Sequence, residues 1–268
     1  MKFGFVVPWG DADDVGDLAA AAEESGWDGL FVWEPVWGVD AWISLGLAAV
    51  RTSKIRLGTL LTPPSRRRPW ELASQVATVD RLSAGRVTLS VGLGAIDSGF
   101  ETFGEQCDKR IRAELMDECL EIACGLWAGQ PFGFSGRHYT VAPTEFPTIG
   151  HTVQSPRVPI WCVGALGHEK SVARAMQWDG IIPQVLEGDG ARQPHLDEVA
   201  ELRSGVTAER GGDDFDIVVE GTMSEHSPAA YAEAGATWWI ESMWDAMSEH
   251  SPVTAAYDRL RQGPPSSG

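Results

Sequence analysis

Two short segments contain residue types that bind anions. Gly164–Gly167 lies between an apolar run and a helix-like stretch, where free backbone N–H groups and the positive end of a helix dipole would face a phosphate. Arg66, Arg67 and Arg68 form a run of guanidinium groups that suits an anionic substrate or cofactor tail. A plain strand-to-helix turn and a solvated loop paired with acidic neighbours remain open alternatives for these two segments.

Glycines and tryptophans favour a flat aromatic ligand. Gly92 and Gly94 leave room for a planar group to approach the backbone. Their spacing resembles a dinucleotide-binding fingerprint, but Asp97 replaces the third glycine, and such a loop belongs early in a Rossmann fold. Indoles near the ends of apolar runs would line a pocket, with core packing as the competing use of each. They are Trp9, Trp33, Trp37 and Trp244.

Residue types exclude three other chemistries. No His-x-His pair follows the first apolar run, which argues against a metal hydrolase, and we expect no metal site. The chain has four lysines, and none ends the sixth apolar run, where a Schiff-base enzyme would need one. No carboxylates end three consecutive middle runs, as a magnesium-dependent enolate chemistry would require.

Eight short apolar stretches alternate with helix-like stretches along the chain. Eight strand-then-helix units predict a closed (β/α)₈ TIM barrel, which carries its chemistry on the loops that leave the strands. We therefore expect the segments above at the barrel mouth, and the loop Ser83–Arg86 at the opposite face, where Arg86 would pair with acidic neighbours and serve stability. The expected strand cores are Phe3–Val7, Gly29–Trp33, Ile55–Leu61, Val87–Val91, Ile160–Gly164, Gly180–Pro183, Phe215–Glu220 and Thr237–Glu241.

Helical periodicity and capping residues predict the intervening helices. We expect one barrel domain over residues 1–262, a flexible tail over 263–268, and an excursion over the barrel mouth at about 129–158 with a small hairpin near Phe132–Val141. The expected helices start near Asp13 or Asp14, span Trp42–Val50, Pro69–Leu82, a stripe from Ile111 to Leu126, His168–Trp178, Ala191–Arg210 and Pro228–Glu233, and end with one that holds Tyr257 and Leu260.

Composition limits the partners and the compartment. The chain has 21 basic and 38 acidic residues, a net charge of −17, which repels nucleic acid and anionic membranes. The apolar run before Pro8 is too short for a signal peptide, and no apolar run reaches membrane-spanning length, so we expect a cytoplasmic protein. The four cysteines lack metal spacing and are expected as buried free thiols. They are Cys107, Cys119, Cys124 and Cys162.

Three long segments resemble the bacterial luciferase-like family of flavin-dependent oxidoreductases. They are Ile55–Gly94, Phe100–Val141 and Val153–Pro183, so the resemblance covers most of residues 1–183. It implies a barrel that holds FMN, or the deazaflavin F420, with the ring across the mouth near the first four strands. The residues that it implies for the cofactor are Thr59 and Leu60, joined by a non-proline cis peptide under the ring; Thr62, Gly92 and Gly94 beside it; and Gly164, Ala165, Leu166 and Gly167 at the phosphate.

One position departs from the family's pattern. Many relatives have an acidic residue followed by histidine after the second strand, whereas this chain has Glu34 followed by Pro35. Proline cannot transfer a proton, so Glu34 becomes the candidate catalytic residue. Its neighbours Trp33 and Trp37 would desolvate the carboxyl group and raise its pKa, which suits a proton donor or acceptor.

The resemblance implies monooxygenation or hydride transfer on a small organic substrate, with FMN reduced by NAD(P)H or by a separate flavin reductase. Trp9, Trp33, Trp37 and Arg66 would line the substrate pocket. An F420-dependent oxidoreductase is the alternative, since the arginine run suits the F420 tail, although the net acidity argues mildly against a polyanionic cofactor. A non-catalytic flavin-binding protein is the alternative of another class. Relatives are often dimers, so we expect a homodimer.

Overall fold

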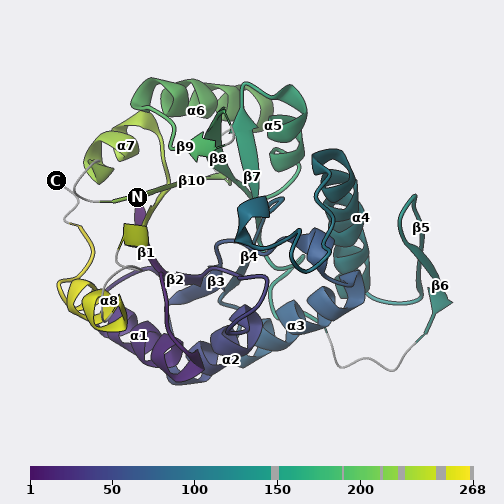
Figure 1. Cartoon of the computed structure of the whole chain (residues 1–268), viewed down its shortest axis with the longest axis horizontal. Helices are drawn as coiled ribbons and strands as arrows, with labels where there is room; N and C mark the ends of the chain where they lie inside the picture. The colour runs from purple at the N-terminus through teal and green to yellow at the C-terminus, as the bar shows by residue number, and fades with distance from the viewer. Residues whose placement is uncertain (146–150, 189, 212–213, 223–226, 246–251, 266–268) are drawn as a thin grey trace.

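Eight parallel strands close into a barrel with helices around its outside (Figure 1). The computed structural model describes residues 1–145, 151–188, 190–211, 214–222, 227–245 and 252–265. Strand β10 pairs with both β8 and β11, and β11 pairs with β1, which closes the ring and confirms the predicted TIM barrel. In spatial order the barrel strands are β1 (Lys2–Val7), β2 (Gly29–Val32), β3 (Arg56–Thr59), β4 (Val87–Val91), β7 (Ile160–Leu166), β8 (Gly180–Glu187), β10 (Asp216–Gly221) and β11 (Trp238–Glu241).

Aspartate caps fix the starts of three outer helices. The side chains of Asp11, Asp40 and Asp108 each accept a hydrogen bond from a backbone N–H in the first turn of α1, α2 and α4. The cap of α1 is therefore Asp11, earlier than the predicted Asp13 or Asp14. The helices are α1 (Ala12–Glu24), α2 (Ala41–Arg51), α3 (Pro69–Leu82), α4 (Lys109–Ala128), α5 (Glu169–Ala175), α6 (Leu196–Arg210), α7 (Pro228–Ala234) and α8 (Pro252–Arg261), with short 3₁₀ turns η1 (Pro64–Arg66) and η2 (Ile96–Ser98).

Two further predicted helix boundaries were wrong. Helix α6 begins at Leu196 rather than Ala191, because β8 runs on and turns back into β9 (Gly190–Arg192), which pairs antiparallel with it. Helix α5 spans seven residues and ends at Ala175, short of the predicted Trp178. In both places, pairing and packing with distant parts of the chain set the boundary.

Aromatic side chains fill the lower barrel interior. The rings of Phe31 and Trp161 have centroids 5.4 Å apart, and those of Trp161 and Trp238 are 5.2 Å apart. Gly58 makes room for this stack, because a Cβ there would lie 2.5 Å from the carbonyl oxygen of Thr88 and 3.0 Å from the Phe31 ring. A second and larger apolar core lies between the strands and the outer helices.

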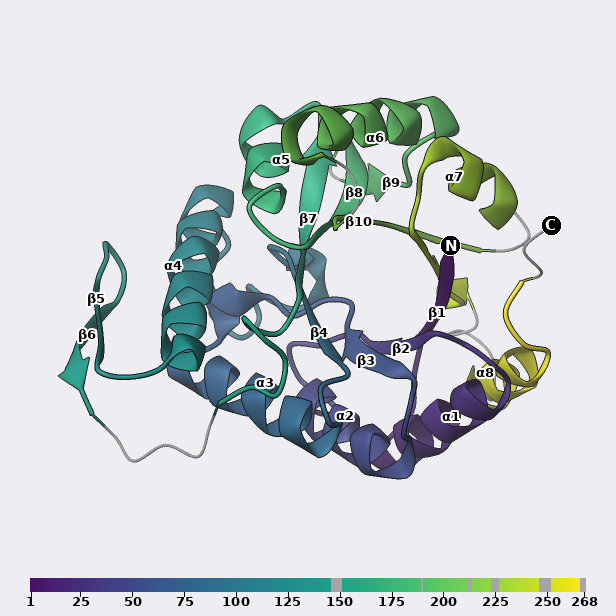
Figure 2. The same ribbon diagram turned by 180° about the vertical axis from the view of Figure 1, so that it is seen from behind.

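The excursion after α4 lies outside the barrel, not over its mouth as predicted. Strands β5 (Phe132–Ser135) and β6 (Thr140–Thr144) form the expected hairpin, which projects beyond α4 in both views (Figures 1 and 2). The carboxylate of Glu118 on α4 accepts hydrogen bonds from backbone N–H groups of the hairpin turn, and Glu114 accepts from its Arg137. Acidic residues of α4 therefore hold the hairpin; residues 146–150 of this stretch lie outside the described part.

The bottom face is held by polar groups that join distant segments. Buried Asp80 accepts hydrogen bonds from the backbone N–H groups of Val153 and Gln154. Arg86 donates to the carbonyl oxygens of Ala49, Thr52 and Ile55, whereas the sequence predicted acidic partners. The loop Ser83–Arg86 thus links α2, β3 and α3 at the start of β4.

The described part of the chain contains no helix long and apolar enough to cross a membrane. Of the four cysteines, Cys119 and Cys162 are buried, and burial raises the pKa of each thiol to about 12. Cys107 and Cys124 are only partly buried, so the expectation of four buried thiols is correct for two. Of the predicted tail 263–268, residues 266–268 lie outside the described part.

Candidate functional site

Three predicted pocket tryptophans meet around one cavity at the carboxyl ends of β1 and β2. Trp9, Trp33 and Trp37 line a space of about 630 Å³, and the Trp9 and Trp33 ring centroids lie 6.1 Å apart. The indole N–H of Trp33 donates to the carbonyl oxygen of Pro8 at 2.9 Å, which fixes the ring between the two strand ends. Trp37 is 81% exposed and leaves one side of the cavity open.

The rest of the cavity wall comes from the starts of two helices. Asp11 and Asp14 form a reciprocal capping box at the start of α1, and Ser44 lies in the first turn of α2. Gly10 adopts a φ of +146°, and a Cβ at this position would lie 2.9 Å from the side chain of Asp14. The volume falls within the roughly 300–1,000 Å³ usual for small-molecule pockets.

Glu34 is held in a network of hydrogen bonds and does not line this cavity. Its Oε1 accepts from Nε of Arg67 at 2.9 Å, and its Oε2 accepts from the hydroxyl of Thr62 at 2.9 Å. Arg66 lies 4.0 Å away, and the Glu34 side chain is 3% exposed. Thr59 extends the network, with its hydroxyl 3.1 Å from that of Thr62. The arginine charges balance the buried carboxylate, so this arrangement positions the loop after β2.

The arginine run is directed into the protein. Arg66 donates to the carbonyl oxygens of Pro35 and Val36, and burial lowers its pKa. Its guanidinium group lies over the Phe100 ring at 5.6 Å, and Arg112 lies over the same ring at 5.3 Å. Arg66 does not line the tryptophan cavity. Of the three arginines in the run, Arg68 is the exposed one, at the start of α3.

The role of Arg112 was not predicted from the sequence, although this residue fixes the loop after β4. It is 1% exposed, and its NH1 group donates to the carbonyl oxygens of Leu93 and Gly94. Its place outside the predicted apolar stripe of the helix carries no sequence signal for binding carbonyl oxygens on another segment. The contact shows that arginines on both sides of Phe100 hold the loops after β2 and β4.

A non-proline cis peptide follows β3, one residue later than predicted. It joins Leu60 to Leu61, whereas the sequence placed it between Thr59 and Leu60. The N–H of Leu60 still donates to the carbonyl oxygen of Val32, so the ladder with β2 continues through Leu60 and the cis bond comes after it.

Two glycines expected near a cofactor ring lie against side chains of the chain itself. A Cβ on Gly92 would lie 2.8 Å from Leu61, and one on Gly94 would lie 2.9 Å from the Phe100 ring. Gly94 also has a φ of +77°, which few other residues adopt. Close packing at the rim therefore accounts for both glycines without a ligand.

The predicted phosphate loop is shorter than expected, because β7 continues through Leu166. Ala165 and Leu166 pair with β8, and the N–H of Ala165 donates to the hydroxyl of Ser171 at 3.0 Å. Gly164 faces outward, where a Cβ would lie 2.3 Å from Ile181. Gly167, with a φ of +78°, is the turn residue before the seven-residue helix α5.

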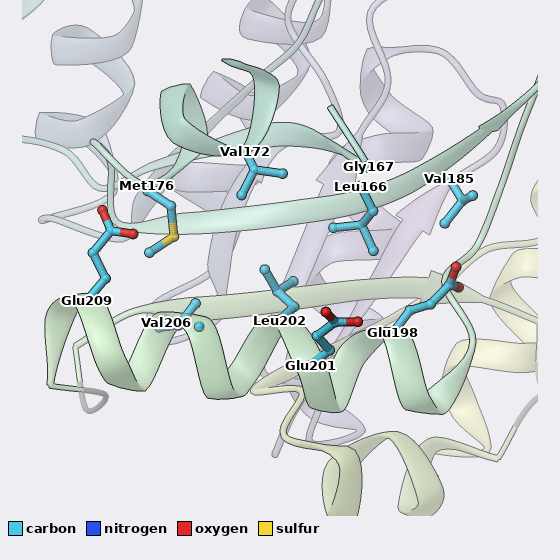
Figure 3. A pocket seen from close by; sticks show the side chains of 11 residues that line it. Leu166, Gly167, Val172, Met176, Val185, Glu198, Glu201, Leu202, Val206 and Glu209 are labelled. Carbon is cyan, nitrogen blue, oxygen red and sulfur yellow. The ribbon is translucent and has the colours of Figure 1, made fainter. Parts of the chain in front are cut away.

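Leu166 and Gly167 line a different cavity from that of the tryptophans (Figure 3). This space of about 540 Å³ lies between α6 and the ends of β7 and β8, with an apolar floor that includes Val172 and Met176. Glutamates of α6 point toward it, and one of them, Glu198, pairs with Arg192. The structure thus separates the predicted phosphate segment from the predicted aromatic pocket.

A second glutamate at the mouth was not identified from the sequence. Glu220, the second-last residue of β10, pairs with Ile240, an interior residue, so its side chain faces into the barrel. It accepts a hydrogen bond from the indole N–H of Trp244, which in turn contacts Trp33 edge-on at 6.4 Å. The signal was present in the alternation of polar Asp216, apolar Val218 and polar Glu220 on the inward face. No cluster of His, Cys, Asp and Glu suited to a metal occurs among the described residues.

Sequence comparison gives relatives over most of the chain. An uncharacterized protein of Mycobacterium tuberculosis is 31% identical over 225 residues, which is 82% of this chain and 73% of the relative. The F420-dependent glucose-6-phosphate dehydrogenase of Nakamurella multipartita is 29% identical over 238 residues, 84% of this chain and 68% of the relative.

Solved structures share the fold. The coenzyme F420 dependent tetrahydromethanopterin reductase from Methanopyrus kandleri superposes with a TM-score of 0.76 at 16% identity and covers 98% of both chains. A type II Baeyer-Villiger monooxygenase from Pseudomonas putida, in complex with FMN, gives a TM-score of 0.62 at 18% identity and covers 83% of this chain and 67% of its own.

The model of one protein family, described as luciferase-like monooxygenase, matches residues 1–264. The match includes all eight barrel strands and the tryptophan cavity at their carboxyl ends. The chain therefore belongs to the luciferase-like monooxygenase family, a class of oxidoreductase enzymes.

Proposed function

We propose that this chain is an F420-dependent oxidoreductase that acts on a small organic substrate. The observation that carries the proposal is the tryptophan-lined cavity at the mouth of a luciferase-like barrel. Curated relatives named as F420-dependent enzymes support F420, and a structural neighbour that binds FMN keeps FMN as the second candidate. When bound, either cofactor supplies hydride transfer, and FMN also supports reaction with O₂ in a monooxygenase.

The cavity fits a planar tricyclic ring. The rings of Trp9 and Trp33 line it, and aromatic rings stack on flat ligands. Trp33 is held by its hydrogen bond to Pro8, so part of the wall is rigid before any ligand enters. Leu60, Thr62 and Gly92 remain predicted neighbours of the ring.

Two segments are candidates for binding the anionic group of the cofactor. Gly167 has open space around its Cβ position, which suits close approach of an anion. The N–H of Ala165, however, already donates to the hydroxyl of Ser171 and is not free for a phosphate. Arg68 is the exposed guanidinium of the run and would meet an anionic tail at the other side of the mouth. We keep Gly164–Gly167 as the predicted phosphate segment and add Arg68 as its competitor.

Binding of the two cofactors to the purified protein tests this proposal. Titration with F420 and with FMN should quench tryptophan fluorescence, with tighter binding for F420. Trp33→Leu should weaken binding at least tenfold, whereas Trp70→Leu, on the exposed start of α3 and outside the cavity, should leave it unchanged. Failure of both cofactors to bind would overturn the proposal.

The reductant and the assembly are separate proposals. FMN would be reduced by NAD(P)H or by a separate flavin reductase, whereas F420 would arrive in its reduced or oxidised form.

We propose a homodimer through α2 and α3, because Ile43, Val50 and Leu82 are each at least half exposed. Leu82 lies within 4 Å of the Cβ position of Gly46, so these apolar side chains form one surface. A monomeric mass by light scattering would contradict it.

A further inference from the structure

Glu220 is a carboxyl group at the barrel mouth that, unlike Glu34, is bound by no arginine among the described residues. Its side chain faces the interior opposite Ile240, above the aromatic stack that closes the lower barrel. It is half-buried, so a ligand at the mouth can reach it. The indole N–H of Trp244 donates to its Oε1, and Trp244 meets Trp33 of the tryptophan cavity edge-on.

The acidic residues on the elements around Glu220 pair with other residues. On β11, Glu241 faces outward and pairs with Arg259; at the end of β8, Glu187 pairs with Arg192. Asp216, at the other end of β10, accepts from Trp161 and Thr237. After β2, Glu34 pairs with Arg67. Among the described residues, none of the ion pairs includes Glu220.

Burial without a balancing cation favours the neutral form of a carboxyl group. Burial raises the pKa of Glu220, and the hydrogen bonds from Trp244 and Ser242 lower it in part. A neutral carboxyl has one oxygen to accept from Trp244 and one O–H to offer to a further partner.

We propose that Glu220 is the proton donor of the site: a neutral carboxylic acid at the mouth that hydrogen-bonds a carbonyl oxygen of the substrate. This role rests on the proposed function. The proton passes from the Glu220 carboxyl to the substrate oxygen as that oxygen becomes a hydroxyl. The hydride that completes the reduction comes from the reduced cofactor, and the carboxylate left on Glu220 takes a proton from water. Glu220 thereby supplies the proton that Pro35 cannot.

Infrared difference spectroscopy tests the protonation state without any cofactor. The spectrum of wild type minus Glu220→Gln at pH 7 should show the C=O stretch of a protonated carboxyl, replaced by carboxylate bands as pH rises. Glu34→Gln is the matched control and should show carboxylate bands alone, because Arg67 and Thr62 bind that group. Carboxylate bands for Glu220 at pH 7 would overturn the proposal.

A second variant keeps the test independent of the folding of Glu220→Gln. Trp244→Phe removes a hydrogen bond that lowers the pKa of Glu220, so the protonated band should persist to higher pH than in the wild type. An unchanged or lower transition would contradict the contact on which the proposal depends.

Kinetics with a carbonyl substrate test the role itself. Glu220→Gln should lower kcat by about 10²–10⁴-fold with little change in KM, and should remove the high-pH fall of kcat. Glu220→Asp should restore part of the rate. An unchanged kcat in a variant that binds the cofactor normally would overturn the role of Glu220 and leave the proposed function intact. Loss of cofactor binding by the wild type would overturn the proposed function, while the infrared result would stand.

Discussion

Two glutamates at the barrel mouth, Glu34 after β2 and Glu220 at the end of β10, have opposite surroundings. Glu34 is 3% exposed and is bound by Arg67 and Thr62, with Arg66 nearby. Glu220 receives hydrogen bonds from Trp244 and Ser242 and takes part in no ion pair within the described part of the chain. One carboxyl is buried with its compensating charge, and the other is buried with neutral donors alone.

This difference separates a positioning role from a chemical one. A carboxylate fixed by arginines has little freedom to exchange a proton, but it ties the loops after β2 and β3 together. A desolvated carboxyl without a cation has a raised pKa and can act as a proton donor. The sequence singled out Glu34 because it stands beside Trp33 and before Pro35, which takes the place of a histidine in the family's pattern, whereas the structure directs attention to Glu220.

The largest effect should come from removing the cation of the Glu34 pair. Arg67→Met leaves a buried carboxylate with a partner 4.0 Å away, and we expect it to lower the free energy of unfolding by about 3 kcal/mol. Urea unfolding measures the change. Arg68→Met, at the exposed neighbouring position, is the matched control and should change stability by less than about 0.5 kcal/mol. Equal effects of the two variants would show that Glu34 does not need its partner.

A smaller effect should follow from an arginine that binds carbonyl and hydroxyl oxygens instead of a carboxylate. Arg86 donates to Ala49, Thr52 and Ile55, and burial lowers its pKa. Arg86→Lys keeps the charge but cannot reach several carbonyls at once, so we expect a loss of about 2 kcal/mol in the same unfolding measurement. Arg81→Lys on exposed α3 surface is the control. A loss as large as that of Arg67→Met would mean that carbonyls hold an arginine as firmly as a carboxylate does.

Local signals account for what the sequence predicted well. Helix α3 and strand β4 match their predicted bounds, Pro69–Leu82 and Val87–Val91, because a proline at the first helical position and an apolar run between turns define them. The barrel follows from the count of such units. The meeting of Trp9, Trp33 and Trp37 follows from their places after the first two strands.

Long-range contacts account for what the sequence did not predict. Strand β7 extends to Leu166 because β8 pairs with it that far. This pairing cannot be predicted from the residues of either strand alone. Arg66 donates to carbonyl oxygens after β2, some thirty residues away in the sequence. Every residue has a backbone carbonyl, so the residue types do not indicate which ones an arginine will bind. Glu220 was visible as a polar residue on an inward strand face, but its isolation from cations depends on which side chains surround it.

The pH dependence of stability should distinguish the two glutamates further. The pKa of Glu220 is raised in the folded state, so its contribution is intact below the unfolded value of 4.5 and is lost as pH rises through the folded value. Glu220→Gln removes this loss, and its stability relative to the wild type should therefore increase from pH 4 to pH 8. Thermal unfolding across this range measures the trend. A difference that stays constant with pH would contradict the burial of an uncompensated acid.

The smallest effect should come from a partly exposed carboxylate that is paired with an arginine, as Glu34 is, but is not buried as deeply. Glu198 accepts from Arg192 and from the N–H of His195 at the start of α6, and these contacts lower its pKa to about 2. Its contribution is present above the unfolded value of 4.5 and is lost as pH falls toward 2, the opposite direction to Glu220. Because solvent screens the pair, Glu198→Gln should cost less than about 1 kcal/mol at pH 7, and less still in high salt. If this variant cost as much as Arg67→Met, burial would not be what separates the glutamate after β2 from a surface ion pair, and the contrast with Glu220 would have to rest on hydrogen bonding alone.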